Sequence, residues 1–291
     1  MLCIAIAITA GAAAARAADP VKVKLEAVII QGAKALKDDI KWSVSPIGGS
    51  EQKAQQVTKA SPELALLPGR YRVQATLGLS TISKDIVVDK AGKQTFDFNS
   101  GYARFNMILQ RGAKPIEENI HWQLYRYTKG GIDENHKLAD FVAPSPQVTL
   151  PEGWYSIRGH YDGVLADTVI EVKAGILYKY TVVAYAGKVG LSAVTSKGKA
   201  VKDKLTWTIQ RAAADKNGKR QTIHTDVTAA PTVMLREGKY IVTAQAGDLY
   251  GEAPLDISAA KRHLGWEPRF TIASAFEDYL KELKAARAQA R

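Results

Sequence analysis

The sequence predicts an all-β protein made of three tandem β-sandwich repeats with a short α-helical tail. Three observations lead to this prediction. Similar segments recur three times at intervals of 80 to 85 residues, apolar and polar residues alternate within them, and helical spacing of apolar residues is confined to about the last 30 residues. An interval above 80 residues is too long for one unit of a solenoid and matches one small sandwich domain.

The N-terminal segment, residues 1–17, reads as a signal peptide. Its apolar stretch MLCIAIAITAGAAAARA ends in Ala15-Arg16-Ala17, the small-x-small pattern that signal peptidase cleaves, although no Lys or Arg precedes the stretch. A short uncleaved membrane anchor is the alternative. No later apolar run reaches the 18 residues that a span needs, so we expect no membrane span in the mature chain and a periplasmic or secreted location.

The first recurring segment places a tryptophan in the middle of an alternating strand. The copies are QGAKALKDDIKWSVS (31–45), QRGAKPIEENIHWQLYR (110–126) and SKGKAVKDKLTWTIQR (196–211). Each begins with a turn that contains Gly and Lys and continues through a polar connection into the strand. Trp42, Trp122 and Trp207 stand between aliphatic residues at period two, so we expect all three to pack in the core.

The second recurring segment is a glycine turn followed by a tyrosine strand. Its copies are LLPGRYRVQATLG (66–78), LPEGWYSIRGHYDG (150–163) and LREGKYIVTAQAGD (235–248). We expect Gly69, Gly153 and Gly238 to adopt a positive φ. The first two copies close with segments 85–99 and 167–184, each of which predicts a β-hairpin around Ala-Gly.

These elements divide the chain into five segments. We predict a signal peptide at 1–17, repeat 1 at 18–101, repeat 2 at 102–187, an incomplete repeat 3 at 188–258 and a helical tail at 259–291. Each repeat offers about six or seven short strands, as in an immunoglobulin-like or transthyretin-like sandwich. The Gly-Lys turn, Trp strand and LPxGxYxV block together resemble the carboxypeptidase-regulatory-like and prealbumin-like modules of bacterial envelope proteins, over residues 21–260. That resemblance implies spacers, adhesive units or carbohydrate-contacting domains.

The tail follows a different pattern. Ser274 and Glu277 form a capping box, and Phe276, Leu280 and Leu283 then share one helical face. The stretch LDISAAKRHLGWEPRFTIASAFEDYL (255–280) resembles the C-terminal end of NAD-dependent sugar-nucleotide epimerases and dehydratases. The glycine-rich loop for the dinucleotide is missing from the sequence, and the pair Tyr125 and Lys129 has the Tyr-x-x-x-Lys spacing but belongs to a predicted strand and turn. We therefore expect no cofactor and no enzymatic activity.

The candidate ligand contacts are aromatic and basic residues. The five histidines do not have the spacing of metal ligands, so we predict no metal site. We also predict no catalytic residue. The formal net charge is +11, and residues 188–220 carry nine Lys or Arg against Asp203 and Asp215. Such a stretch attracts polyanions, with simple solubility as the alternative. The residues that we single out as ligand contacts are Trp154, Tyr155, Tyr161, Lys199, Lys202 and Lys204.

These observations favour an exported, non-enzymatic envelope protein that acts as a structural or interaction module. Its expected partners are anionic polysaccharides or other envelope components, and not nucleic acid. One alternative is a dedicated polysaccharide-binding protein that uses the basic face of repeat 3 and the aromatic residues near Trp154. A second is a protein related to the epimerases through its tail alone.

Overall fold

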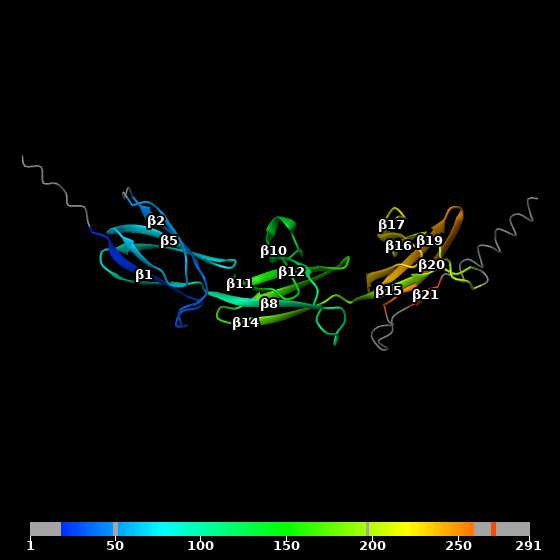
Figure 1. Ribbon diagram of the computed structural model, residues 1–291, viewed down its shortest axis with the longest axis horizontal. Helices are drawn as coiled ribbons and strands as arrows, with labels where there is room; N and C mark the ends of the chain where they lie inside the picture. The colour runs from blue at the N-terminus through cyan, green and yellow to red at the C-terminus, as the bar shows by residue number, and fades with distance from the viewer. Residues whose placement is uncertain (1–18, 49–51, 196–197, 259–268, 272–291) are drawn as a thin grey trace, which may run out of the picture. The chain divides into compact units, whose positions relative to one another are not determined.

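The computed structural model describes residues 19–48, 52–195, 198–258 and 269–271. The chain packs as two compact units. One comprises Met1–Ala103, Gln147–Gly153 and Glu171–Tyr178, and the other comprises Arg104–Pro146, Trp154–Ile170 and Lys179–Arg291. Strand pairing follows the threefold sequence pattern and produces three pairs of sheets. Figure 1 shows strands of each pair. The exact limits of three separate domains stay predictions.

Each pair consists of a three-stranded and a four-stranded sheet. In the first pair the strand orders are β4-β1-β7 and β3-β2-β5-β6. The bounds are β1 Val21–Val28, β2 Lys41–Ile47, β3 Gln55–Thr58, β4 Glu63–Leu66, β5 Gly69–Leu77, β6 Ser80–Val88 and β7 Gly92–Asp97.

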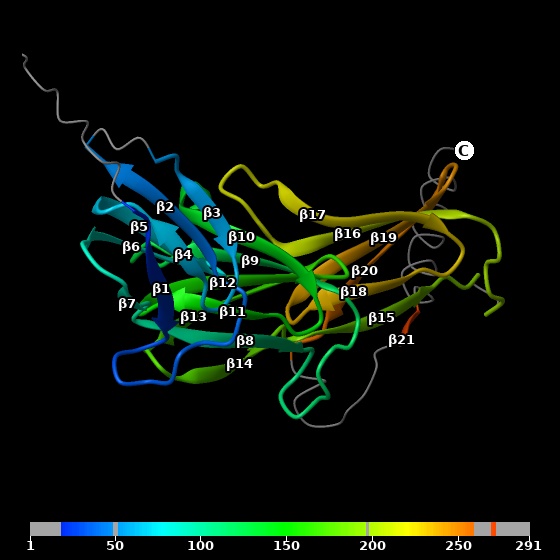
Figure 2. The same ribbon diagram turned by 60° about the vertical axis from the view of Figure 1, so that its left-hand side comes forward.

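The other two pairs have the same arrangement. Their orders are β11-β8-β14 with β10-β9-β12-β13, and β18-β15-β21 with β17-β16-β19-β20; strands of the last sheet lie side by side in Figure 2. The bounds are β8 Ser100–Ile108, β9 Ile120–Arg126, η1 (a 3-10 turn) Glu134–His136, β10 Lys137–Ala143, β11 Gln147–Pro151, β12 Gly153–Tyr161, β13 Val164–Val172, β14 Leu177–Val183, β15 Ala186–Ser192, β16 Leu205–Ala214, β17 Arg220–Thr228, β18 Thr232–Arg236, β19 Lys239–Ala246, β20 Leu249–Asp256 and β21 Arg269–Thr271.

The sheets of the first pair enclose one apolar core. Buried residues alternate with exposed ones along β5, as period-two patterning requires. Trp42 from the four-stranded sheet meets Phe96 from the three-stranded sheet edge to face, with ring centroids 5.2 Å apart. The two sheets therefore pack face to face as a β-sandwich, and a second core of the same kind fills the third pair.

The predicted role of the repeated tryptophans is confirmed. Trp42, Trp122 and Trp207 are 2%, 0% and 0% exposed. Each indole Nε1–H donates to a backbone carbonyl, at 2.9, 3.0 and 2.9 Å respectively. Opposite each ring in the neighbouring strand stands a small residue, namely Ala75, Gly159 and Ala244 in chain order. The sheet thus makes room for the indole, and the ring's one polar atom is satisfied inside the core.

The tyrosine segment also behaves as predicted. Gly69, Gly153 and Gly238 have φ of 159°, 155° and 152°. Two residues further on, the tyrosine hydroxyl turns back to the chain: Tyr71 donates to the carbonyl of Leu67 at 2.8 Å and Tyr240 to that of Arg236 at 2.7 Å. In these two copies the bond resembles the tyrosine corner, in which a tyrosine hydroxyl donates to the backbone a few residues upstream.

The hairpins predicted at 85–99 and 167–184 are wrong. β6 lies in the four-stranded sheet, whereas β7 lies in the three-stranded sheet and pairs in parallel with β1, with Val23 opposite Gly92. The Ala-Gly turn therefore carries the chain from one sheet to the other. β13 and β14 are divided between two sheets in the same way. Alternation predicts the strands themselves but does not reveal which neighbour each strand pairs with.

The third copy contains a strand that the sequence does not predict. Arg269–Thr271 forms β21 inside the segment predicted to be a helical tail, and it pairs in parallel with β15 at Gly190, Leu191 and Ser192. The three-stranded sheet of the third copy thus gains a parallel partner like the one that β7 provides to β1. Without this partner, the backbone N–H and C=O groups on that side of β15 would form an unpaired strand edge, so pairing with β21 is favoured. The predicted helices lie outside the described residues.

Candidate ligand-binding surfaces

Trp154 lies on an exposed aromatic patch. Its side chain is 53% exposed, and its ring centroid lies 6.3 Å from that of Tyr127, which is 42% exposed. Pairing of β12 with β9 brings the two residues together, and the backbone N–H of Tyr127 donates to the carbonyl of Trp154 at 3.3 Å. We call these two residues the aromatic patch. Two exposed rings of this kind can stack on the apolar face of a sugar.

The other two aromatic candidates do not belong to this patch. Tyr155 is 6% exposed, and burial raises the pKa of its hydroxyl. It follows Trp154 directly on a strand, so it points to the opposite face, where Tyr71 and Tyr240 stand in the other repeats. Tyr161 is half-buried at the far end of β12, and burial raises its pKa also. The predicted aromatic cluster is therefore limited to Trp154, with Tyr127 as a partner that we did not predict.

A charged network covers the outer face of the same sheet. The hydroxyl of Tyr125 donates to Glu134 Oε2 at 2.8 Å, and Arg158 Nη1 donates to Glu134 Oε1 at 2.8 Å. Arg158 also binds both carboxylate oxygens of Asp167, at 2.9 and 3.2 Å. Burial, and then the bond to Glu134, raise the pKa of Tyr125 to about 12. Because these groups satisfy one another, the network acts as a tie between β9, β12 and β13.

The three candidate lysines lie in one loop between β15 and β16. Lys199, Lys202 and Lys204 are all exposed. Two backbone bonds hold this segment: Val201 N–H donates to the carbonyl of Ala193 at 2.9 Å, and Thr195 N–H to that of Lys199 at 2.8 Å. We call residues 199–204 the basic loop. Within the described part of the third pair of sheets, the close contacts between basic and acidic side chains involve Arg220, His224 and Lys239. The ammonium groups of the basic loop are thus available to an anion.

The single basic stretch of the sequence forms two separate surfaces. The basic loop precedes β16, whereas Lys216 and Lys219 follow it in the turn to β17. A strand of 10 residues separates the two groups, roughly 30 Å at about 3.3 Å per residue. The contacts of Trp154 are with Tyr127, and those of Lys199 are with Thr195. The described contacts thus do not join the aromatic and basic candidates.

Two of the described histidines lie in close contact with an acid. His121 contacts Asp140 at 3.1 Å, and His136 contacts Asp133 at 2.8 Å. Among the described residues, no three His, Cys, Asp or Glu side chains gather closely enough to hold a metal ion. In residues 19–48, 52–195, 198–258 and 269–271, no helix has the length and apolar character needed to cross a bilayer.

Comparison with known proteins identifies no family. No family model and no curated protein matches the sequence. Among solved structures, the TIE protein of Bacillus anthracis is 14% identical, with 82% of this chain and 48% of that chain covered and a TM-score of 0.24. The minor pilin GBS52 of Streptococcus agalactiae is 9% identical (55% and 94% covered, TM-score 0.32), and a streptococcal ancillary pilin is 12% identical (87% and 98%, TM-score 0.32).

These similarities are too weak to carry an argument about function. This chain spans about half of the Bacillus anthracis protein. The comparisons give no support to the resemblance of residues 255–280 to sugar-nucleotide epimerases, and this segment begins with the last residues of strand β20 and contains strand β21.

The sequence did not single out Tyr127 of the aromatic patch, or Arg211, whose guanidinium lies 4.9 Å from the ring centre of Tyr240 and lines a groove on the third repeat. Their signal is the repeated pairing of the Trp strand with the Tyr strand. This register sets Arg126 opposite Tyr155 and Arg211 opposite Tyr240. Aligning the Trp strand with the Tyr strand in each copy shows which residue stands opposite the tyrosine. In the second and third copies this is the residue four positions after the tryptophan.

Proposed function

We propose that this protein is an exported, non-enzymatic interaction module of the cell envelope that holds anionic polysaccharide through the basic loop of its third repeat. The observation that supports the proposal is a cluster of exposed positive charge. The six residues 199–204 contain three exposed lysines, Lys199, Lys202 and Lys204, and one acid, Asp203. Trp207, which follows this loop, and its counterparts Trp42 and Trp122 are buried in the cores and cannot contact a ligand.

The corresponding loops of the other repeats support this assignment. In each copy the loop is anchored by the same backbone bond: the N–H of Leu36, Ile116 or Val201 donates to the carbonyl of Ala27, Met107 or Ala193, at 2.8, 2.9 and 2.9 Å. The charges differ. Residues 34–39 contain two lysines and two acids, and residues 114–119 contain one lysine and two acids. A shared backbone therefore carries an excess of positive charge in the third copy alone.

The test is binding of dextran sulfate, with uncharged dextran as the neutral probe, by the full mature chain. We expect the variant K199A/K202A/K204A to bind dextran sulfate at least tenfold more weakly than the wild type, and wild-type affinity to fall as salt screens the charges. The matched control is K34A/K37A/K41A, which removes three exposed lysines from the first repeat. Equal weakening by both triple variants would show that net charge alone attracts the polymer and would refute the proposal.

A second candidate function rests on the aromatic patch, which suits a neutral sugar. If the patch binds saccharide, Trp154→Ala and Tyr127→Ala should each abolish a signal on a glycan array, and Trp154→Phe should retain part of it. An array signal that is unchanged in both alanine variants would remove this candidate.

A further inference from the structure

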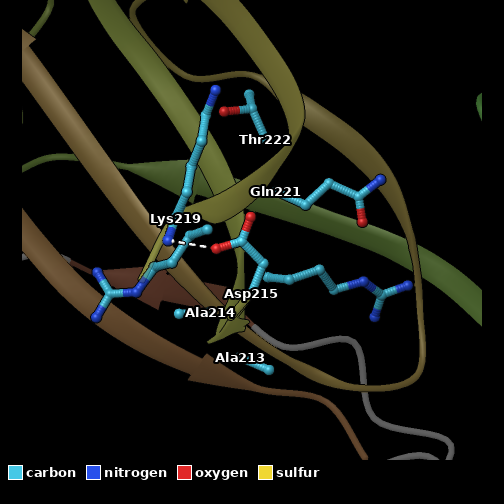
Figure 3. A pocket seen from close by; sticks show the side chains of 8 residues that line it. Ala213, Ala214, Asp215, Lys219, Gln221 and Thr222 are labelled. Carbon is cyan, nitrogen blue, oxygen red and sulfur yellow. Dashed lines mark hydrogen bonds between the residues drawn. The ribbon is translucent and has the colours of Figure 1, made fainter. Parts of the chain in front are cut away.

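The hairpin that joins β16 to β17 contains a groove on the third repeat. The groove is open to solvent, has a volume of about 610 Å³ and is lined by Arg211, Asp215, Lys219, Arg220, Gln221 and Thr222, together with two alanines. Figure 3 shows the side chains that line the pocket, with Lys219, Gln221 and Thr222 among those labelled. Its volume falls within the 300–1,000 Å³ range of small-ligand sites. Three of the lining side chains are cationic and one is acidic.

A break in strand pairing opens the groove. Gln210 stands opposite Thr222 and Ala214 opposite Arg220, so three residues of β16 face one residue of β17. Such bulges bend the strand and redirect side chains, and they are frequent next to binding sites. The small side chains of Ala213 and Ala214 leave the space between the hairpin arms unfilled.

Arg211 is the central residue of the groove. It stands opposite Tyr240, and its guanidinium lies 4.9 Å from the centre of that buried ring. Gly238 makes room for it, because a Cβ on this residue would come within 2.8 Å of Arg211 Nη1. The ring holds the guanidinium plane by a cation–π contact, which leaves its N–H groups free to donate. Within the described part of the chain, no carboxylate or carbonyl accepts a hydrogen bond from this side chain.

The acid in the groove is already engaged. Asp215 Oδ1 accepts from the backbone N–H of Asn217 at 2.9 Å and from that of Lys219 at 2.8 Å, the bond drawn in Figure 3. It therefore shapes the hairpin turn, as Asp commonly does. Arg220 has a distant partner, with its Nη1 3.8 Å from Glu252 Oε1. The groove thus keeps an excess of positive charge.

We propose that this groove is a binding site for a single oxyanion group, a sulfate or a carboxylate carried on a sugar, with Arg211 as its principal ligand. A planar guanidinium binds such groups through two parallel N–H···O bonds, which a lysine cannot form. Lys219 and Arg220 add charge, and the Gln221 amide and Thr222 hydroxyl supply polar contacts for sugar hydroxyls. This site goes beyond the proposed function, because the groove contains no residue of the basic loop and its anion binding does not depend on that loop.

The test is titration of the full mature chain, followed by NMR of its backbone amides, with four probes: inorganic sulfate, glucuronate, glucose 6-sulfate and glucose. We expect the three anions to shift the amide signals of residues 211–222 with saturable curves, and glucose to leave them unchanged. Arg211→Ala should weaken anion binding at least tenfold. Arg211→Lys, which keeps the charge but lacks the planar fork, should weaken it also.

Arg126→Ala is the matched control. Arg126 is exposed and stands opposite Tyr155, as Arg211 stands opposite Tyr240. Because both residues are arginines, each substitution removes one positive charge. We expect Arg126→Ala to leave the sulfate-induced shifts of the amides of residues 211–222 as they are in the wild type. Reading these amides, rather than total sulfate binding, separates this site from the basic loop. Circular dichroism confirms that each variant is folded. Binding within twofold of wild type in a folded Arg211→Ala, equal losses in Arg126→Ala, or a glucose affinity equal to that of glucuronate would overturn the proposal.

Discussion

The first and third sandwiches share one strand arrangement but differ in how they are closed and charged. The closing strand β7 has six residues, whereas β21 has three and is reached after a longer segment of chain. The loop before the Trp strand carries balanced charge in the first sandwich and an excess of lysine in the third. The comparison shows that core residues and turn glycines set the frame, whereas exposed residues on that frame are free to differ and to acquire a function.

The largest expected effect tests whether the frame is shared. Trp42→Ala and Trp207→Ala each remove a buried indole and its hydrogen bond to a backbone carbonyl. Each substitution should lower the free energy of unfolding of its own sandwich by about 3–5 kcal/mol. Chemical denaturation followed by tryptophan fluorescence measures this loss. A cost below about 1 kcal/mol at either site would break the comparison.

The closing strand of the third sandwich gives the next effect. A chain that ends at Ser258 lacks β21 and leaves three residues of β15 without that partner. We expect a loss of about 2 kcal/mol in the third sandwich, since each net backbone hydrogen bond contributes about 1 kcal/mol. Limited proteolysis with mass spectrometry should show faster cleavage in residues 186–258 and unchanged cleavage in residues 19–99. Identical cleavage of the truncated and full chains would mean that β21 adds nothing to stability.

The aromatic patch should contribute little to the frame. Trp154 is 53% exposed and contacts one other exposed ring. Trp154→Ala should therefore change the free energy of unfolding by less than about 0.5 kcal/mol, as surface substitutions usually do. The same denaturation experiment checks this value beside Trp207→Ala. A cost comparable to that of a core tryptophan would make Trp154 a structural residue.

The smallest effect is a pH dependence of the first sandwich's closing strand. Hydrogen bonds from Lys24 and Lys93 lower the pKa of Glu26 below its usual value of 4.5 and connect β1 to β7. A carboxylate with a lowered pKa stabilises the folded state above its unfolded pKa, and this contribution disappears as pH falls through the folded value. Glu26→Gln should thus be less stable than wild type at pH 7 and equal to it near pH 2. A difference independent of pH would exclude the ionic contribution.

The sequence predicts the frame well because its signals are local. Alternation around Trp42, Trp122 and Trp207 fixes the core strands, and the glycine before each tyrosine fixes a turn. Pairing between distant segments is not local, so the sequence did not reveal that β7 joins β1 or that Arg269–Thr271 completes the third sheet. The candidate site divides in the same way: exposure of Trp154 and the lysines follows from patterning, whereas the position of Tyr127 and Arg211 depends on register across strands.

The most direct test of the central claim moves the charge from one sandwich to the other. The variant D38K/D39K/K202A/K204A places two lysines on the loop of the first sandwich and removes two from the basic loop. If loop charge on a common frame makes the site, this variant should bind dextran sulfate within about threefold of wild type, while K202A/K204A alone binds at least tenfold more weakly. If the relocated lysines restore no affinity, binding depends on features of the third sandwich beyond its loop charge, which contradicts the central claim.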